Sequence, residues 1–260
     1  MRLLSARRAA LMIAALGAAT TADAQLVNLG PGSFTPLASV ITFSEAGHPL
    51  GQTNPVYTFL AVPGLGDVTV SFAGAFVGQT VTGGFPATLT GSPTGPLSLA
   101  PGTTTNIVND AAVSTAPVLS GAPLFNGPIA VLFSTPVAAV GLSGGFFNAI
   151  GGTTITAFDA TGAALGSIVN SALGVEFYGL ADASGANVIS GIAFYITGPE
   201  PAGFGIDNLT FGAAEVVPEL PDPQVVPVPA AVWGGMALLG AMGVTKRLRR
   251  RSELASDIDA

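Results

Sequence analysis

The acidic residues have the clearest capacity for chemistry in this sequence. Between Gln25 and Gln224 the chain holds eleven aspartates and glutamates and no lysine or arginine. Two carboxylates about 5 to 9.5 Å apart can hydrolyse a glycosidic bond, one as acid and the other as nucleophile or base. The candidates for such a pair are Glu45, Asp159, Glu176, Asp182, Glu200 and Asp207.

Asp207 and Asn208, in a late apolar segment, form a second candidate site. A carboxylate, an amide carbonyl and nearby backbone oxygens suit calcium, which takes about six to eight oxygen ligands. Glu45 is a further candidate ligand, because the first and last strands of a β-sandwich often lie close together. Asp207 could instead cap the backbone N–H groups of a neighbouring turn. The sequence leaves both roles open.

Other catalytic chemistries lack the residues that they need. His48 is the only histidine, so a nucleophile–histidine–acid arrangement or a zinc site would depend on one loop residue. Cysteine is absent, which excludes disulfides and thiolate nucleophiles. The single tryptophan, Trp233, lies near the C-terminus, so the body has no indole platform for sugars. We therefore expect no enzyme activity, and no cofactor other than calcium.

The charge distribution restricts the partners of the body. All eight lysines and arginines lie near the two ends of the chain. Eleven carboxylates without a base create a negative field that repels phosphate and sulfate. Nucleic acid is excluded as a partner, because nothing in the body could neutralise its phosphates. Calcium and neutral glycans remain the expected ligands.

The segments that must position these residues have the pattern of short β-strands. Val68, Val70 and Phe72 alternate with polar residues, as in a strand with one buried face. The stretch 159–162 separates two apolar runs and is typical of a hairpin turn. The expected strands lie within residues 39–47, 56–62, 67–78, 129–134, 137–147, 153–162, 164–170, 188–197 and 204–211.

Many short strands at this spacing predict an all-β fold, an antiparallel β-sandwich over residues 25–212. Within it, residues 79–128 are rich in Gly, Pro and Thr and are expected to form a long, irregular excursion with one or two short strands. A Pro-rich spacer follows at 213–229. The predicted core residues are Phe133, Val140, Ile155, Phe158, Ile192, Phe194, Ile206 and Leu209.

Residues 1–24 have the three parts of a secretory signal peptide. Arg2, Arg7 and Arg8 precede an apolar stretch. Ala22 and Ala24 then form an A-x-A cleavage site directly before Gln25. We expect the secretion translocon to export the chain and this segment to be removed.

The C-terminal region predicts a membrane anchor. An uncharged apolar run over 230–245 is long enough for a transmembrane helix only if the preceding residues enter the interface. A basic cluster follows at once and should remain cytoplasmic, which places the body on the far side of the inner membrane. The cluster consists of Lys246, Arg247, Arg249, Arg250 and Arg251, and an acidic tail follows over 252–260.

The order of these C-terminal parts resembles the PEP-CTERM sorting signal of Gram-negative bacteria, in its VPxPAA variant. The motif reads V-P-V-P-A-A and consists of Val226, Pro227, Val228, Pro229, Ala230 and Ala231. Residues 230–251 supply the apolar helix and the basic cluster that follow it. The resemblance implies recognition and cleavage by an exosortase and release to the cell surface or extracellular matrix, commonly in cells that produce exopolysaccharide. The tail at 252–260 departs from the pattern, since such signals usually stop soon after the arginines.

The body itself is similar to the jelly-roll ectodomains often attached to such tails and to galactose-binding-like β-sandwiches. The likeness covers about residues 39–212 and is a likeness of strand pattern. Two hypotheses follow. The favoured one is an exported surface or matrix protein, associated with exopolysaccharide and without catalytic activity. The alternative is a secreted polysaccharide-active enzyme that uses paired carboxylates.

Overall fold

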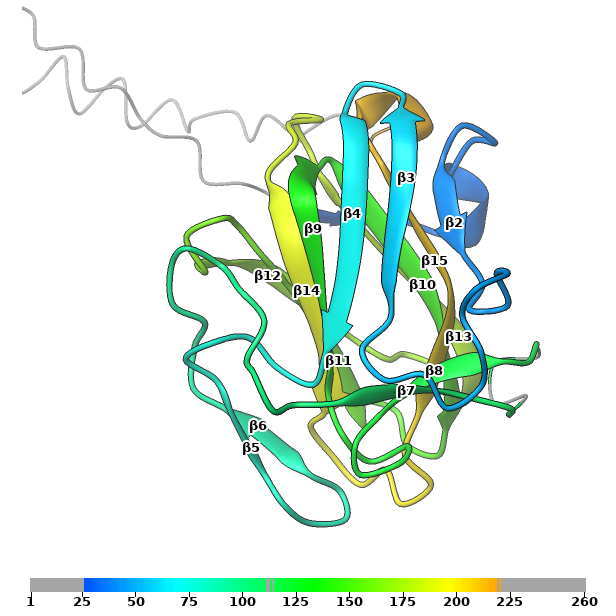
Figure 1. Ribbon diagram of the computed structural model, residues 1–260, viewed down its shortest axis with the longest axis vertical. Helices are drawn as coiled ribbons and strands as arrows, with labels where there is room; N and C mark the ends of the chain where they lie inside the picture. The colour runs from blue at the N-terminus through cyan, green and yellow to red at the C-terminus, as the bar shows by residue number, and fades with distance from the viewer. Residues whose placement is uncertain (1–25, 111–112, 114, 219, 221–260) are drawn as a thin grey trace, which may run out of the picture. The chain divides into compact units, whose positions relative to one another are not determined.

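The described chain folds into two antiparallel sheets, which confirms the predicted all-β class. The computed structural model describes residues 26–110, 113, 115–218 and 220 (Figure 1). All registered pairings in the two sheets are antiparallel. The first sheet, in spatial order, contains β1 (Leu26–Asn28), β13 (Gly174–Asp182), β10 (Ala139–Phe147), β15 (Gly205–Gly212), β8 (Val118–Gly121) and β7 (Thr105–Val108), and β2 (Ser39–Ile41) also pairs with β15. The second contains β12 (Ala164–Val169), β11 (Thr153–Phe158), β14 (Ile189–Ile196), β9 (Ile129–Val137), β4 (Gly66–Ala73) and β3 (Val56–Val62).

The main hydrophobic core lies between these sheets. It takes alternate residues from both, such as Val140 and Ile206 from the first sheet and Ile155 and Ile192 from the second. Alternation sends every second side chain of a strand to the same face, so each sheet supplies one apolar layer. All eight predicted core residues are buried. Seven lie in this main core, whereas Phe158 belongs to a smaller cluster.

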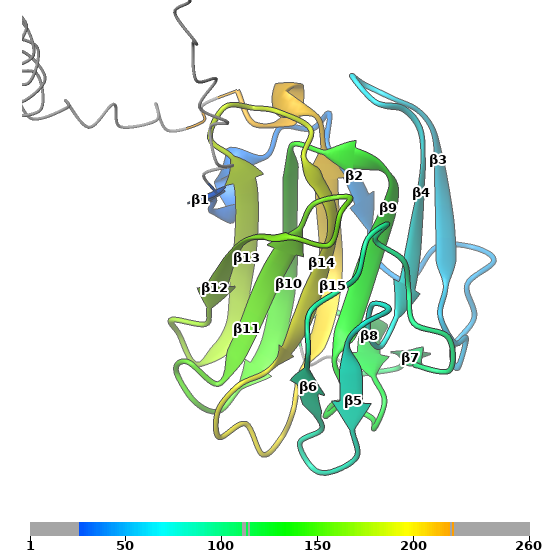
Figure 2. The ribbon, with the colours of Figure 1, turned by 90° about the vertical axis from the view of Figure 1, so that its left-hand side faces the viewer.

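The excursion at 79–128 is more ordered than the sequence suggested. It contains β7 and β8, which extend the first sheet, and a separate hairpin of β5 (Thr80–Thr82) and β6 (Thr88–Thr90). Each of these strands has three or four residues, too few to produce a clear alternating pattern. Figure 2 shows the β5–β6 hairpin in front of the second sheet.

The chain around this hairpin covers the outer face of the second sheet. Phe76 and Leu97 pack there against Phe158, Ala130 and Ala193. The rings of Phe76 and Phe158 meet edge to face, with their centroids 5.6 Å apart. The second sheet therefore has apolar contacts on both faces, which explains why Phe158 is buried although it points away from the main core.

The first and last described segments meet at one end of the sandwich. Leu29 packs with Val216 and Val217, which lie in and beside the short 3-10 helix η2 (Ala214–Val216). The Thr35 N–H also donates a hydrogen bond to the Val216 carbonyl at 2.9 Å. The packed body thus continues beyond Gly212, into the residues predicted as the start of the spacer.

The predicted hairpin at 159–162 is confirmed, since it joins β11 to β12. Asp159 Oδ1 accepts hydrogen bonds from the N–H groups of Thr161 and Ala163, at 2.8 and 2.9 Å. Gly162 completes the turn with a φ of 84°, a conformation that suits glycine. The sequence signals were sufficient here because turn and strands are local in the chain.

The predicted signal peptide and transmembrane helix lie outside the described residues. Within the described part of the chain there is no α-helix, and no helix long and apolar enough to cross a membrane.

Candidate functional site

Most of the candidate catalytic carboxylates hold loops in place. Glu200 is 1% exposed, and its two oxygens accept the N–H groups of Asn148 and Ala149 at 2.6 and 3.3 Å. Glu176 likewise accepts the N–H groups of Ser171 and Ala172. A carboxylate that already accepts two backbone N–H groups stabilises its loop.

The other loop acids follow the same pattern. Asp182 is buried and accepts hydrogen bonds from the Ser184 N–H and hydroxyl, and Asp159 caps the β11–β12 turn. Described residues form three pockets. One contains Asp110 as its only acid and another contains Glu176, whereas the third is lined by no acid. None of these pockets contains the two facing carboxylates that glycoside hydrolysis requires.

Asn170 is the centre of the best connected buried polar group. Its Oδ1 accepts the Thr153 N–H at 2.9 Å, and its Nδ2 donates to the carbonyls of Ala149 and Ala172 at 2.6 and 3.1 Å. The Thr153 hydroxyl lies 2.9 Å from the Tyr178 hydroxyl. We call Asn170, Thr153 and Tyr178 the Asn170 network. Its polar atoms all have partners, as buried polar groups normally do.

Strand pairing brings Glu45 close to Asp207 and Asn208, the three residues predicted to bind calcium. In the pairing of β2 with β15, Ile41 lies opposite Leu209, so the next position of this register places Thr42 beside Asn208. Glu45 turns back onto Thr42, and its Oε1 accepts the Thr42 N–H at 2.6 Å and the Thr42 hydroxyl at 2.9 Å. The strand expected at 39–47 therefore lies beside the last strand, as predicted, although β1 precedes it in the chain and pairs with β13 instead.

Asp207 is 1% exposed and has hydrogen-bond partners of its own. Its carboxylate accepts the Thr115 hydroxyl and, at 2.7 Å, the Asn208 N–H. Burial raises the pKa of Asp207 above its ordinary value, the hydrogen bonds from Thr115 and Asn208 oppose this, and the charge of Glu45 adds to it. Asn208 has a φ of 53°, and here the β10–β15 register shifts. Asp207 therefore bonds its own strand neighbour and a threonine hydroxyl, and no N–H group of a neighbouring turn among the described residues.

Tyr57 completes what we call the Glu45 cluster, which consists of Glu45, Tyr57 and Asp207. The Tyr57 ring packs edge-on against Phe43 and stacks on His48, with centroids 6.1 and 3.9 Å apart. Among the described residues, neither the buried Tyr57 hydroxyl nor the buried Glu45 Oε2 has a hydrogen-bond partner. Burial, followed by the charges of Glu45 and Asp207, raises the pKa of Tyr57 far above its ordinary value.

The Glu45 cluster offers few open ligands for a cation. The described residues contain no group of three or more His, Cys, Asp or Glu that could hold a metal ion. Hydrogen bonds already occupy Glu45 Oε1 and the Asp207 carboxylate, which leaves Glu45 Oε2 and the Tyr57 hydroxyl. Calcium normally takes more oxygens than these, and backbone carbonyls or water would have to supply the rest. Calcium at Glu45, Asp207 and Asn208 stays a prediction.

His48 belongs to the packing of the Glu45 cluster. Its ring stacks on Tyr57, and its Nδ1 lies 3.1 Å from Gln52 Oε1. No Ser–His–Asp arrangement is formed by these contacts, and the imidazole serves as a cover for the phenol ring.

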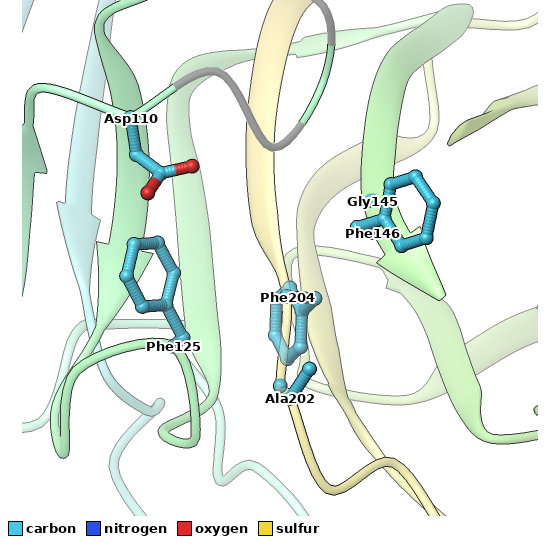
Figure 3. Close-up of a pocket in the computed structure, with 7 residues that line it drawn as sticks. Asp110, Phe125, Gly145, Phe146, Ala202 and Phe204 are labelled. Carbon is cyan, nitrogen blue, oxygen red and sulfur yellow. The ribbon is translucent and has the colours of Figure 1, made fainter. Parts of the chain in front are cut away.

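A pocket of about 190 Å³ lies where the β8–β9 loop, β10 and the start of β15 meet. Figure 3 shows Asp110 and Phe125 on one side of it, Phe146 on the opposite side and Phe204 between them. Phe146 is 57% exposed, whereas Phe204 is almost fully buried and belongs to the core. This pocket, which we call the aromatic pocket, is therefore lined by aromatic residues and one carboxylate, but the ring of Phe204 packs against Phe194 in the core.

The predicted targeting residues lie outside the described part of the chain. These are the cleavage site at Ala22, Ala24 and Gln25, the motif at residues 226–231, and the basic residues at 246–251. No family model, no curated protein and no solved structure matches the chain.

Sequence reasoning did not single out Tyr57 or the aromatic pocket. Tyr57 alternates with exposed Val56 and Thr58 in a predicted strand, so its inward direction could have been read from the pattern. Phe125 and Phe146 carry no such signal, because the pocket depends on bringing together segments that are distant in the sequence.

Proposed function

We propose that this chain is an exported cell-surface or extracellular-matrix protein whose β-sandwich has a structural or binding role without catalysis. The observation that carries the proposal is that most of the candidate catalytic acids form hydrogen bonds within loops. Glu200, Glu176, Asp182 and Asp159 hold loops, and none of the three pockets described above contains two carboxylates. A polysaccharide-active enzyme would need such a pair in an open groove.

The two ends of the sequence supply the cellular part of the proposal. The signal-like segment 1–24 would direct export, and residues 226–251 would hold the precursor in the inner membrane for exosortase recognition. Release would then place the body among exopolysaccharide at the surface. The two antiparallel sheets support a jelly-roll or galactose-binding-like sandwich, which we propose as the finer fold class.

Fractionation of cells tests this proposal. An epitope inserted after Gln25 would be followed through membrane, surface and medium, with and without the last 35 residues. We expect the full chain to pass through a membrane-bound precursor and the truncated chain to be exported without one. Replacing Arg247, Arg249, Arg250 and Arg251 by glutamate should abolish stable anchoring, because flanking cations hold the helix orientation. An epitope that stays in the cytoplasm in every case would refute export.

A further inference from the structure

The largest of the three pockets described above lies at one side of the sandwich. It has a volume of about 500 Å³, and we call it the edge pocket. Its lining residues belong to β1, β12, β13 and the turns that follow β1 and β12. Figure 2 shows these three strands together at one side of the sandwich. β12 is the last strand of the second sheet, and β1 and β13 are the outermost strands of the first, so the pocket opens between the edges of the two sheets.

β1 covers only part of the edge of β13. Its pairing ends with Asn28 opposite Leu180, and the Leu29 N–H then donates to the Gly179 carbonyl at 2.8 Å. The backbone groups of a strand point to alternate sides, so Phe177, two residues from Gly179, directs its N–H and carbonyl to the same edge. Among the described strands, only β1 pairs with this edge of β13. The backbone of Phe177, which lines the edge pocket, therefore offers it one donor and one acceptor.

Two polar side chains add further hydrogen-bonding groups to the edge pocket. The Glu176 carboxylate accepts the Ser171 hydroxyl at 2.6 Å and the N–H groups of Ser171 and Ala172 at 2.8 and 3.0 Å. These donors use three of the about four lone-pair positions of a carboxylate, which leaves one for a ligand hydroxyl. Asn28 is exposed and lines the same pocket, and its amide can both donate and accept. The carboxylate is oriented before a ligand arrives, which lowers the entropic cost of binding.

The remaining walls and the charge select the class of ligand. Leu29, Ile168 and Val169 give the pocket an apolar part. Polar groups beside apolar surface suit a sugar ring, whose hydroxyls donate and accept and whose C–H groups are apolar. Glu176 is the only charged residue that lines the pocket, so an anion would be repelled. Calcium would find a single carboxylate where it takes about six to eight oxygens.

A peptide strand is a poorer fit to the same place. The part of β13 that β1 leaves open runs only from Gly174 to Phe177. Only alternate residues of that part present their backbone groups to the edge, so an added strand would gain few hydrogen bonds.

We propose that the edge pocket binds one residue of a neutral saccharide. Its hydroxyls would donate to Glu176 and to the Phe177 carbonyl, and would accept hydrogen bonds from the Phe177 N–H and the Asn28 amide. Its apolar side would pack against Ile168 and Val169. This inference rests on the proposed binding role of the sandwich and gives that role a place. It does not depend on the sorting signal, so loss of saccharide binding and failure of export would be separate results.

Calorimetric titration of the full chain, in a detergent without a sugar headgroup, tests the class of ligand. The probes are the neutral polysaccharides dextran, mannan and galactan, with dextran sulfate as the anionic counterpart. We expect at least one neutral probe to bind, and dextran sulfate to bind at least about tenfold more weakly than that probe, because the acidic body repels sulfate. Binding of none of the three neutral probes, or equal or tighter binding of dextran sulfate, would overturn the proposal.

Substitutions assign the binding to the edge pocket. Asn28→Ala removes the amide and should weaken saccharide binding about tenfold. Its urea midpoint should not change, because Asn28 is exposed. Glu176→Gln replaces one acceptor oxygen by a donor and should weaken binding by a similar factor, and its urea midpoint shows separately whether the loop at Ser171 is loosened. Asn28→Ala keeps the test independent of that loop.

Matched controls remove the same groups at exposed positions away from the pocket. They are Asn187→Ala and Glu215→Gln. Both should bind the saccharide as the wild type does. Binding that survives both pocket variants, or that the controls weaken equally, would place the saccharide elsewhere and refute the assignment.

Discussion

The Asn170 network and the Glu45 cluster are two buried polar regions of the same sandwich. They differ in how many of their polar atoms have hydrogen-bond partners. In the Asn170 network, each polar side-chain group has a partner, and Tyr178 ends the chain of bonds at Thr153. In the Glu45 cluster, the Tyr57 hydroxyl and Glu45 Oε2 have none among the described residues. Burial raises the pKa of both tyrosines, so desolvation alone does not separate them.

This difference predicts how each region responds to substitution. A buried polar group with all its bonds stabilises one conformation, because breaking any bond leaves another group unsatisfied. A buried polar group without a partner costs free energy in the native state, and a bound ion or water is one arrangement that removes this cost. The Asn170 network should therefore respond to substitution through folding, and the Glu45 cluster through pH or ligands.

Asn170→Ala should have the largest effect. It leaves the Thr153 N–H and the Ala149 and Ala172 carbonyls without this partner, and each buried orphan costs about 1 to 3 kcal/mol. We expect a loss of about 3 kcal/mol in the free energy of unfolding, measured by urea titration. Asn187→Ala, at an exposed position, is the control. A loss below about 1 kcal/mol would show that the network is dispensable.

Removing the hydroxyl of each tyrosine gives a matched pair of variants. Tyr178→Phe breaks a hydrogen bond to Thr153 and should lower the free energy of unfolding by about 1 kcal/mol. Tyr57→Phe removes a buried hydroxyl that has no hydrogen-bond partner among the described residues and should be neutral or stabilising. Urea midpoints of both variants make the comparison. Equal losses at the two sites would mean that an ordered water already satisfies Tyr57.

Asp207→Asn should change the pH dependence of stability. Because the folded-state pKa of Asp207 is raised, the folded protein binds more protons than the unfolded chain between the two pKa values. The free energy of unfolding contributed by this group therefore falls as pH rises through that window, from the ordinary aspartate pKa upward. The variant lacks this fall and should be at least as stable at neutral pH.

Urea midpoints between about pH 4 and pH 7 measure this effect, with Asp67→Asn as a control at a less buried acid. Parallel pH profiles for the wild type and Asp207→Asn would contradict the expected shift.

Among these tests, calcium should have the smallest effect on stability. An ion shared by Glu45 and Asp207 would supply the missing partner of Glu45 Oε2 and raise the thermal midpoint relative to chelator. At a calcium concentration equal to Kd, mass action adds about 0.4 kcal/mol. Glu45→Gln should abolish the rise, and Glu176→Gln should retain it. An unchanged wild-type midpoint at millimolar calcium would leave Asp207 with only its hydrogen bonds to Thr115 and Asn208.

Much of the sandwich follows from local sequence, and the rest depends on distant contacts. β3 and the β11–β12 hairpin were predicted because alternation and an Asp–Gly turn are local signals. β13 escaped prediction because Glu176 and Gly179 interrupt its apolar pattern, although both are explained by the fold. Glu176 holds the preceding loop, and a side chain at Gly179 would strike Leu29.

The candidate sites divide in the same way. The nearness of Glu45 to Asp207 was predicted from the general arrangement of first and last strands, and the β2–β15 pairing agrees with it. The unpartnered hydroxyl of Tyr57 could not be predicted, because the absence of a bond depends on every surrounding side chain. The aromatic pocket likewise requires three separate segments to be placed in space before Phe125, Phe146 and Asp110 can be recognised together.

The contact between Leu29 and Val216 makes the body topologically close to a ring. Its two ends touch through the apolar cluster and the Thr35–Val216 hydrogen bond, so a short linker could join them without moving a strand. The chain could then be reopened at Gly83, in the turn between β5 and β6, where an added Cβ would meet nothing within 4 Å. The final architecture should therefore not depend on which strand is synthesised first. The sandwich is a candidate for circular permutation.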